Sequence, residues 1–394
     1  MDSDTKMKIG LAIYNFDPKK GGAERYTYDL AVRLAAKGHD VCVFCVNGIE
    51  TKGITVVPLK TYRYPRWFRN LSFALAHRHA VRKVRPDVIL GYGNVLDFDV
   101  YQSHGGVHSI WMQREIASYE KRAWRLIKKI LLQYNINQII QRKMEEHAIA
   151  AYRSKRIIAV SDMVRDHFSS HYGMDKQHID VVYNGVDIER FRPATVSPKG
   201  PATKILFCAG NFRLKGLGPL LQAMGNVVRQ GEKVHLTVMG RGKKEPFKAL
   251  IDREQLGDLI NFIGEHSAPE EIYRQAHNFR NPTYYDSYSL TTVEAMASGL
   301  PVITTNWAGA SCFVGHEEGY IIDEPDNIGA LTDAIIALTD PARRKVMSEN
   351  ARKKAELLTI EKNADQIENI LLEVFQQKER ERLYNMSGSS QNKK

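Results

Sequence analysis

Two adjacent glycines lie in a loop that could hold an anionic group. Gly21 and Gly22 separate an apolar run from a helical pattern within residues 19–25, which read Lys-Lys-Gly-Gly-Ala-Glu-Arg. Bare backbone amides at the beginning of a helix face outward, and the helix dipole favours a negative charge there. A tight turn from strand to helix would use the same residues, and the loop lacks the G-x-G-x-x-G pattern of dinucleotide sites. The loop alone leaves both interpretations open.

Two basic side chains lie in a second loop of this kind. Residues 210–216 read Gly-Asn-Phe-Arg-Leu-Lys-Gly, and they connect a strand expected at 204–209 to a helical pattern. Arg213 and Lys215 therefore lie at the carboxyl edge of the expected sheet, where open α/β sheets bind their ligands. Surface Arg and Lys side chains are usually only solvated, but this position favours binding of a phosphate.

A third loop, rich in hydroxyl groups, begins at Asp286 and leads into a helix that Gly299 ends. Glu294 is expected in the first turn of that helix. There it can form a capping box with Thr291, which would stabilise the helix by about 1 kcal/mol. Taken alone, the pattern favours this structural role for Glu294 over ligand binding.

The apolar runs that flank these loops alternate with helical patterns. The first half begins with a βαβ unit, and further short strands follow, which gives strand 8–14, helix 24–37 and strands 41–46, 87–90, 156–160 and 179–182. Pro, Lys, Gly, Ser and Thr dominate residues 190–203, as in an interdomain linker. The second half repeats the alternation with strands 204–209, 233–239 and 301–305 and helices 217–229, 290–298 and 360–382. The sequence therefore predicts two doubly wound α/β domains.

The composition agrees with this prediction. The chain has 394 residues, 43% of them hydrophobic and 26% charged, which is about twice the size of a typical globular domain. It shows no signal peptide and no apolar run of about twenty residues, so we expect a cytoplasmic protein that does not span the membrane. Cys42 and Cys45 form a C-x-x-C pair inside an expected strand. Their odd spacing sends the two side chains to opposite faces, so we expect no redox role.

Basic residues are unevenly distributed in a chain whose net charge is +11. Residues 58–90 contain eight Lys or Arg and one acid. Two basic segments, 62–69 and 121–132, also contain aromatic and aliphatic side chains. That mixture suits an interfacial helix on anionic lipid, and a solvated basic face on a core helix is the alternative. No nucleic-acid-binding module is recognisable, so we expect an anionic membrane surface and not nucleic acid as partner.

Several short motifs occur in the order found in one enzyme family. They are Gly21-Gly22-Ala23-Glu24-Arg25, Asn184-Gly185-Val186-Asp187 with Phe191, Lys215-Gly216, Gly240 with Gly242, and the run Glu-Ala-Met-Ala-Ser-Gly-Leu-Pro-Val at 294–302. Together they resemble the family 4 glycosyltransferases of the GT-B fold over nearly the whole chain. Within that family, residues 99–108, Asp-Val-Tyr-Gln-Ser-His-Gly-Gly-Val-His, resemble the lipopolysaccharide-core glucosyltransferase branch.

This resemblance implies a reaction and an architecture. A retaining, metal-independent enzyme would move a hexose from a UDP- or GDP-sugar donor to a glycan or lipid-linked acceptor, in synthesis of lipopolysaccharide core or cell-surface polysaccharide at the inner face of the cytoplasmic membrane. Two Rossmann-like domains would face each other across a cleft. Residues 1–184 would form the acceptor side and 185–364 the donor side, with a helix at about 365–385 packing back on the first domain and a disordered tail at 386–394.

The resemblance also assigns roles to residues. Gly22 would offer its amide to the donor phosphates, Arg213 and Lys215 would neutralise the leaving diphosphate, and Glu294 would bind the ribose. Asp286 stands where the family usually has a Glu and would hold hydroxyls of the transferred sugar, so this departure leaves the sugar open. The other implied donor-binding residues are Gly21, Asn184, Gly210, Gly240, Gly242, Ile263, Ser289, Leu290 and Thr291.

Two histidines complete the expected catalytic group. His104 and His108 lie in a glycine-rich loop and could contact the sugar or acceptor, although a lone loop histidine is as often an ordinary surface residue. Asp97 and Asp99 form the D-x-D pattern that binds metal in another glycosyltransferase fold, and here we expect loop carboxylates without metal. Two alternatives remain, a sugar-nucleotide epimerase on the same fold and a non-catalytic lipid- or polyanion-binding protein.

Overall fold

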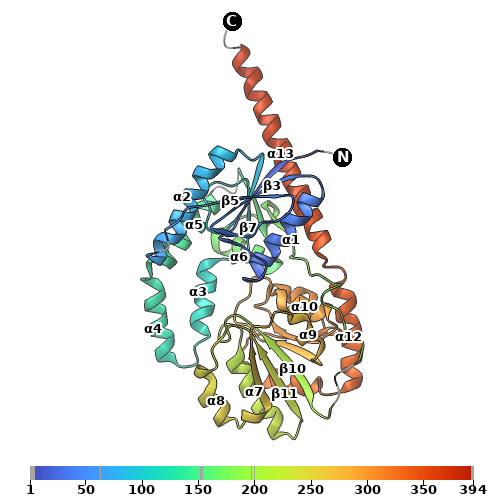
Figure 1. Ribbon diagram of the computed structural model, residues 1–394. Coiled ribbons are helices and arrows are strands. Elements are labelled where there is room, and N and C mark those ends of the chain that lie inside the picture. The colour runs from blue at the N-terminus through green and yellow to red at the C-terminus, as the bar shows by residue number, and fades with distance from the viewer. Residues whose placement is uncertain (1–4, 63, 151–153, 197, 199, 392–394) are drawn as a thin grey trace.

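The structure is a computed structural model of the chain, and it describes residues 5–62, 64–150, 154–196, 198 and 200–391. Two parallel β-sheets, each covered by helices on both faces, form two domains (Figure 1). This arrangement confirms the prediction of two doubly wound α/β domains.

The first sheet contains seven parallel strands. Their order in space is β5 (Ile54–Pro58), β3 (Asp40–Cys45), β1 (Lys8–Ala12), β6 (Val88–Tyr92), β7 (Val100–Ser103), β8 (Arg156–Ala159) and β9 (Ile179–Val181). In the central strand β1, Ile9 and Leu11 are fully buried, as expected for a strand with helices on both sides. A separate two-stranded sheet pairs β2 (Asn15–Phe16) with β4 (Asn47–Gly48).

Helices of the first half cover both faces of this sheet. The helices of this half are α1 (Gly22–Ala36), α2 (Arg66–Val84), α3 (His108–Ala117), α4 (Arg122–Gln133), α5 (Ile136–Ala150), α6 (Asp162–Tyr172) and the short η1 (Lys176–His178). Helix α1 packs on one face, and α2, α5 and α6 pack on the other. Helices α3 and α4 extend from the first domain toward the second (Figure 1).

The second sheet contains six parallel strands. Their order is β12 (Ile260–Gly264), β11 (Val234–Met239), β10 (Thr203–Cys208), β13 (Asn278–Asn281), β14 (Val302–Thr305) and β15 (Gly319–Ile322). Helices α7 and α11 pack on one face, and α10 and α12 pack on the other. The helices of this half are α7 (Leu217–Arg229), η2 (Glu245–Phe247), α8 (Lys248–Arg253), η3 (Gly257–Leu259), α9 (Pro269–Arg274), α10 (Leu290–Ala297), η4 (Gly309–Phe313), α11 (Ile328–Ala337) and α12 (Pro341–Ala355).

The last helix, α13 (Ile360–Gln391), returns to the first domain and then projects beyond it (Figure 1). Its apolar residues Ile367 and Leu371 join the core beneath α1. His39 contacts Glu368 at 2.8 Å, and Lys378 contacts Asp99 at 2.9 Å. The helix begins at Ile360, where the helical pattern at 360–382 predicts it, and five residues before the packing segment of about 365–385 that the resemblance implied. The prediction of a disordered tail from residue 386 is wrong as far as 391, where the helix continues without interruption; residues 392–394 lie outside the described residues.

The chain passes between the domains twice, and the two crossings lie against each other. The amide of Val186 donates to the carbonyl of Leu358 at 2.8 Å. A Cβ at Gly185 would lie 2.4 Å from the backbone of Ile360, so only glycine allows this close approach. The Asn-Gly-Val-Asp motif is therefore part of the connection between the domains.

The sequence did not predict every strand of the structure. The expected strands are present, but β5, β7, β12, β13 and β15 were not predicted. Strand β13 reads Asn-Phe-Arg-Asn and is nevertheless fully buried. Because three of its four residues are polar, its sequence does not indicate a strand in the core. Cys42 and Cys45 are free thiols that lie in two different core clusters, on opposite faces of the sheet, as the odd spacing predicts.

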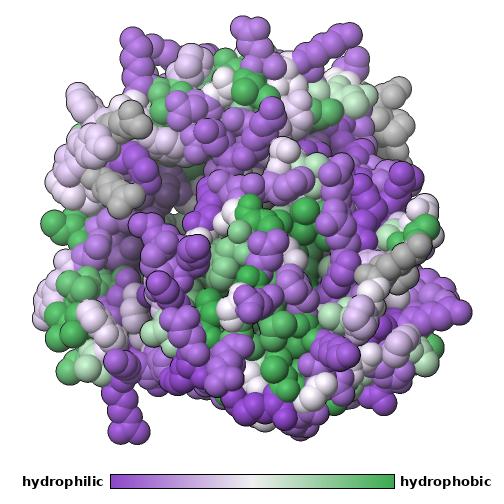
Figure 2. All heavy atoms as spheres, turned by 60° about the horizontal axis from the view of Figure 1, so that its bottom comes forward, coloured by the Kyte–Doolittle hydropathy of each residue, from purple (hydrophilic) through white to green (hydrophobic). Residues whose placement is uncertain are grey.

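The surface is largely hydrophilic where Figure 2 shows it, with apolar side chains gathered in separate patches. Within the described ranges, no helix has the length and hydrophobicity needed to cross a membrane.

Candidate functional site

Both sheets have a point where the strand order reverses. In the first sheet it lies between β1 and β6, and in the second between β10 and β13. Loops that follow such strands diverge to opposite faces and leave a crevice at the carboxyl edge of the sheet. The Gly21–Gly22 loop follows β1 and its β2 extension, the Arg213–Lys215 loop follows β10, and Asp286 follows β13. The topology therefore places three of the predicted loops at switch points.

The two loops of the second switch point meet in an ion pair. Lys215 Nζ lies 2.5 Å from Asp286 Oδ2, and each side chain is 19% exposed. Lys215 also donates to the carbonyl of Tyr285 at 3.0 Å. A primary ammonium group next to a carboxylate is suited to a ligand that carries an anion next to hydroxyl groups.

Asp286 also has a structural role. Its Oδ1 accepts a hydrogen bond from the amide of Ser289 at 2.9 Å. Ser289 is the N-cap of α10 and has a left-handed backbone with φ of 73°, so the preceding carboxylate satisfies an amide at the helix start. Buried Ser289 Oγ in turn accepts from Asn281 and contacts Thr292.

The expected capping box between Thr291 and Glu294 is absent, and this prediction is wrong. Helix α10 begins at Leu290, so Glu294 is its fifth residue and lies beyond the first turn. Glu294 Oε2 accepts instead from the hydroxyl of fully buried Tyr273 at 3.0 Å. Burial raises the pKa of Glu294, and Tyr273 and the guanidinium groups of Arg25 and Arg190 oppose that rise. The site thus holds a carboxylate with free acceptor capacity next to two cations.

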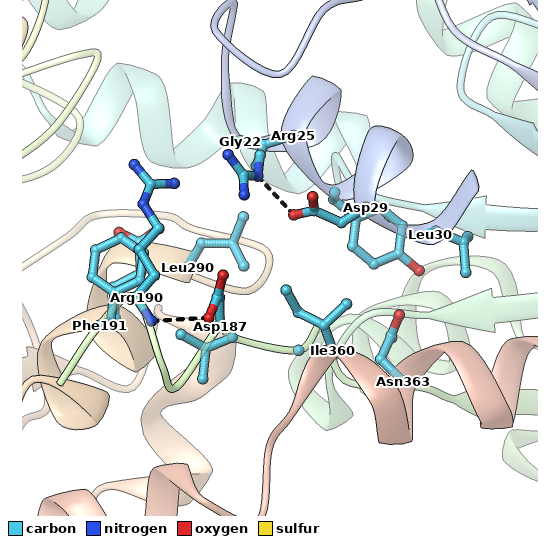
Figure 3. Close-up of a pocket in the computed structure, with 14 residues that line it drawn as sticks. Gly22, Arg25, Asp29, Leu30, Asp187, Arg190, Phe191, Leu290, Ile360 and Asn363 are labelled. Atoms are coloured by element: carbon cyan, nitrogen blue, oxygen red, sulfur yellow. Dashed lines mark hydrogen bonds and ion pairs between the residues drawn. The ribbon is translucent and has the colours of Figure 1, made fainter. Parts of the chain in front are cut away.

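Glu294 and Arg25 line a small interdomain cavity of about 60 Å³ (Figure 3). Its residues come from α1, from the chain after the first crossing and from the beginning of α13. Arg25 is held by Asp29 at 2.7 Å, and Arg190 is held by Glu270 at 2.8 Å. Both guanidinium groups at the cavity therefore have a carboxylate partner.

The glycine loop of the first domain touches the second domain. A Cβ at Gly22 would lie 3.1 Å from Leu290, and one at Gly21 would lie 3.8 Å from the guanidinium of Arg241. Arg241 also donates to the carbonyl of Lys20 at 3.2 Å. Gly22 is the first residue of α1, so its amide is at the positive end of that helix. The predicted anion-binding loop therefore lies against the donor-side loops.

Arg213 is turned toward the first domain. Its Nη2 lies 3.5 Å from Oε1 of Glu115, and its guanidinium stacks 3.8 Å from the ring centre of Tyr119. Glu115 is 4% exposed and also lies 3.7 Å from Lys128. Burial raises the pKa of Glu115, and both cations oppose that rise. Arg213 is thus a link between domains as well as a candidate phosphate ligand.

His104 and His108 share a second cavity, of about 310 Å³, with Tyr92 and Glu145. His104 packs against the rings of Tyr26 and Tyr92 at 4.7 and 5.1 Å, and burial lowers its pKa to about 4. His108 begins α3, its amide donates to Glu145 at 3.1 Å, and burial lowers its pKa. The Nε2 atoms of both histidines are buried without a hydrogen-bond partner among the described residues. Both rings are therefore neutral groups with unused hydrogen-bonding capacity.

The loop that carries His104 contacts the loop that carries Asp286. Ser287, the neighbour of Asp286, donates from its hydroxyl to the carbonyl of His104, and its own carbonyl accepts from Ser161 at 2.7 Å. A Cβ at Gly106 would overlap the hydroxyl of Tyr285, so glycine lets the two loops close on each other. The loop after β7 and the loop after β13 are thus in direct contact across the domains.

The remaining predicted residues lie after β10 and β11, in β12 and next to the first crossing between the domains. Gly240 has φ of 126°, and its amide donates to the carbonyl of Gly264 at 2.8 Å, which joins its loop to the turn after Ile263. A Cβ at Gly242 would overlap Phe212, so only glycine fits beneath that ring. Gly210 is exposed, and Asn184 is buried with an Oδ1 that has no hydrogen-bond partner among the described residues.

Sequence reasoning missed a second link between the domains. Arg114 of α3 donates to the carbonyl of Tyr284 at 2.9 Å and pairs with Glu324 at 2.7 Å. Its guanidinium lies 3.7 Å from the ring centre of Trp307. Like Glu115 and Tyr273, Arg114 is separated from its partners by long stretches of chain. The sequence feature that could have pointed to this link was the pair of opposite charges at positions 114 and 115. Such charges on a helix are usually solvated.

The D-x-D carboxylates bind basic side chains. Asp99 is 7% exposed and pairs with Lys155 and Lys378, and Asp97 lies 3.5 Å from Arg78. In the part of the chain that the structure describes, no group of three or more His, Cys, Asp or Glu side chains is arranged to hold a metal ion.

Two family models match consecutive parts of the chain. Residues 20–190 match glycosyltransferase family 4, and residues 187–354 match glycosyl transferases group 1. The chain belongs to the family 4 glycosyltransferases. The predicted loops around Gly22, Lys215, Asp286 and Glu294 all lie within the matched ranges, and the protein is accordingly a glycosyltransferase.

Curated relatives of this glycosyltransferase differ in the reaction named for them. The D-inositol 3-phosphate glycosyltransferase of Corynebacterium kroppenstedtii is 29% identical over 377 residues, 85% of this chain and 81% of its own length. The lipopolysaccharide glucosyltransferase WaaG of Escherichia coli K12 is 21% identical over 366 residues, 89% of this chain and 94% of its own length.

Solved structures share the fold. The crystal structure of WaaG has a TM-score of 0.74 at 20% identity and covers 92% of this chain and 99% of its own. Sucrose-phosphate synthase from Thermosynechococcus elongatus has a TM-score of 0.75 at 20% identity, with 93% and 98% covered. These likenesses confirm the GT-B fold predicted for this glycosyltransferase.

Proposed function

We propose that this glycosyltransferase moves a hexose from a UDP-sugar to a glycan or lipid-linked acceptor, with retention at the anomeric carbon and without a metal ion. UDP-glucose is the first candidate donor. Supporting this choice, Anabaena HepE, which shares the fold with a TM-score of 0.67, has been solved with UDP-glucose, and a relative of similar length is a lipopolysaccharide glucosyltransferase. GDP-sugars are the second class of donor.

The observation that carries the proposal is the pair of Lys215 and Asp286 at the second switch point, 2.5 Å apart. When a donor binds, its diphosphate replaces Asp286 as the partner of the Lys215 ammonium group. Asp286 Oδ2 can then accept hydrogen bonds from hydroxyl groups of the sugar. Oδ1 continues to cap α10 through Ser289, so the carboxylate stays in place. The new contacts of the diphosphate with Lys215 and of the sugar with Asp286 must offset the loss of the ion pair between them.

The chemical step needs few protein groups. The bond from the anomeric carbon to the diphosphate oxygen breaks, and a bond from the acceptor oxygen forms on the same face of the sugar. The acceptor's proton passes to the departing diphosphate oxygen, so no protein nucleophile is assigned. Lys215, Arg213 and the amide of Gly22 stabilise the charge on the leaving diphosphate.

Glu294 would bind the ribose of the donor. Its carboxylate accepts from Tyr273 and retains lone pairs for two hydroxyl groups. Tyr273 therefore acts as a positioning residue for Glu294. The neutral rings of His104 and His108 would contact the transferred sugar or the acceptor from the first domain.

Helix α4 supports a peripheral location on the inner face of the cytoplasmic membrane. One side of this helix leaves large apolar residues between 43 and 61% exposed, namely Trp124, Leu126, Ile127, Ile130 and Leu131. Arg122 and Lys129, also exposed, would contact anionic headgroups. Lys128 of the same helix faces inward to Glu115 instead.

A thermal-shift screen tests the donor assignment. A ligand at about a hundred times its Kd stabilises a protein by about 2.7 kcal/mol. UDP-glucose, UDP-N-acetylglucosamine and GDP-mannose would be compared on the wild-type chain and on Glu294→Gln. We expect a clear rise in Tm with one UDP-sugar and a smaller rise in the variant. If none of these donors raises the Tm of the wild-type protein, the proposal is wrong.

A further inference from the structure

A cavity of about 340 Å³ lies at the edge of the second sheet that is opposite the donor loops. His277, which lines it, directly precedes β13, whereas Asp286 follows that strand. Helices α9 and α12, which lie on the same side of the second domain in Figure 1, form its other walls together with the interdomain linker. Tyr273 also lines the cavity, and its hydroxyl holds Glu294 of the donor site. None of the residues proposed to contact the donor lines the cavity within the described ranges, so the two sites are separate.

The described residues that line this cavity include three cations and no acid. Arg344 and Lys345 lie on α12, and Arg274 is the last residue of α9. None of the three forms an ion pair with a side chain that the structure describes. Burial lowers the pKa of Arg344, and Asp340, which caps α12 from outside the cavity lining, opposes that fall. Even with Asp340 counted, the cations outnumber the acids by three to one, so the cavity keeps an excess of positive charge.

This positive charge acts on both walls of the cavity. Burial lowers the pKa of His277, the hydrogen bond to the carbonyl of Pro198 opposes that fall, and the charge of Arg344 adds to it. Arg344 Nη1 donates to Thr203 Oγ1 at 3.2 Å. The amide of the next residue, Lys204, donates to His277 Nδ1 at 2.9 Å. The guanidinium and the neutral imidazole are therefore held to adjacent residues of one strand, in a positive field that an anion would neutralise.

The cations have hydrogen-bond donors to offer. Arg344 uses Nη1 for Thr203 and for the carbonyls of Leu338 and Thr339, at 2.8 and 2.7 Å. Its Nε and Nη2 form no hydrogen bond with the described residues, and neither does the ammonium of Lys345. A guanidinium edge of this kind can donate two parallel bonds to one oxyanion.

The rest of the lining suits the organic part of a ligand. Apolar side chains come from Pro193, Pro198, Leu300 and Pro341. Ser298 adds a hydroxyl group, since it is 3% exposed and its Oγ has no hydrogen-bond partner among the described residues. Mainly apolar walls with a few polar groups are typical of sites that enclose an organic molecule rather than a free inorganic ion.

We propose that this cavity binds an organic phosphate at a site separate from that of the sugar donor. Arg344, Lys345 and Arg274 hold the phosphate, and the proline-rich wall packs against the organic part. A phosphate dianion matches the excess of cations better than a single carboxylate does. The inference does not depend on which nucleotide-sugar is the donor.

Three probes test the class of ligand. Phenyl phosphate carries both features, inorganic phosphate lacks the apolar part, and benzyl alcohol lacks the charge. Calorimetric titration of the full chain should give a Kd for phenyl phosphate that is at least about tenfold lower than for either of the others. Equal affinity for the two phosphates would show a plain anion site and overturn the proposal. Equal affinity for benzyl alcohol, or no binding of phenyl phosphate, would overturn it as well.

Single variants in the two sites test the location. Arg274→Gln and Lys345→Gln should each weaken binding of phenyl phosphate about tenfold and leave binding of UDP unchanged. Lys215→Gln, in the proposed donor site, should weaken binding of UDP and leave binding of phenyl phosphate unchanged. The matched control is Lys353→Gln, exposed on the same helix and outside the cavity lining, which should change neither.

The same titrations separate failure of this proposal from failure of the proposed donor. If Lys215→Gln abolishes binding of phenyl phosphate while Arg274→Gln and Lys345→Gln leave it unchanged, the probe occupies the donor site and the proposal is wrong. If UDP does not bind the wild-type chain, the proposed donor is contradicted, while the effects of Arg274→Gln and Lys345→Gln on phenyl phosphate still decide the present proposal.

Discussion

Replacement of Asp286 separates its two contacts. Asp286→Ala removes the cap on Ser289 and the partner of Lys215 together. Asp286→Asn keeps an oxygen that can cap the helix but removes the negative charge. We therefore expect both variants to lose transfer activity, and the alanine variant, which also loses the cap, to lose more stability than the asparagine variant.

The structure sets the size of each effect. Loss of the cap costs about 1 kcal/mol, and loss of a partner for the mostly buried Lys215 ammonium costs about 1–3 kcal/mol more. Asp286→Ala should then lower the free energy of unfolding by about 2–4 kcal/mol, or Tm by roughly 4–16 °C. Charge-assisted bonds to sugar hydroxyls are worth about 1.5–3 kcal/mol each, so kcat/KM should fall about ten- to a hundredfold in both variants.

Calorimetry and steady-state transfer assays on the same preparations measure these quantities. Asp340 offers a matched control, because it caps α12 through the amide of Ala342 at 2.9 Å and does not line the site. Asp340→Ala should lower Tm and leave kcat/KM of the folded enzyme unchanged. If Asp286→Asn transfers sugar at the wild-type rate, Asp286 does not hold the sugar and serves only as the cap.

Four further outcomes are expected. Transfer should continue at full rate in EDTA, because in the proposed mechanism Lys215 and not a metal neutralises the diphosphate. Vesicles with anionic lipid should bind the chain, and salt or charge reversal of Arg122 and Lys129 should weaken that binding in a sedimentation assay. Arg280→Leu should raise the free energy of unfolding by about 1–4 kcal/mol, because Arg280 is fully buried with two unpartnered nitrogens among the described residues and burial lowers its pKa to about 9. Burial raises the pKa of Glu145 to about 7, so the folded state favours the protonated acid. The free energy of unfolding should therefore fall by about 3 kcal/mol in all as the pH rises from about 4.5 through 7.

For each of these four predictions, a specific result would contradict it. Activity lost in EDTA and restored by magnesium would require a metal. Equal binding to neutral and anionic vesicles would exclude an electrostatic role for α4. A lower Tm for Arg280→Leu would mean that the guanidinium contributes to the fold through its bond to the carbonyl of Phe279. Urea titrations of Glu145→Gln at several pH values should lack the wild-type slope between pH 4.5 and 7, and an unchanged slope would assign it to another group.

The donor side of the site could largely be anticipated from local pattern. Glycines between a strand and a helix can be recognised from neighbouring residues alone, and so can basic residues after a strand. The order of the strands then places these loops at the carboxyl edge of a sheet. Lys215 and Asp286 each follow a strand at the switch point, so their proximity was implied once the second sheet was recognised. Glu294 was placed in the wrong turn because hydroxyl-rich residues before it imitate a capping box, while the actual cap is Asp286.

The sequence by itself determined the two-domain α/β architecture, the loops of the donor site and the family. Only the tertiary structure decided which groups hold those loops in place. Tyr273 fixes Glu294, Glu115 faces Arg213, and Arg114 joins α3 to Trp307 and Glu324. These contacts join residues from 21 to 210 positions apart. Periodicity reports which face of an element is buried, but not which distant side chain lies opposite, because that depends on how helices and domains pack after the backbone has formed.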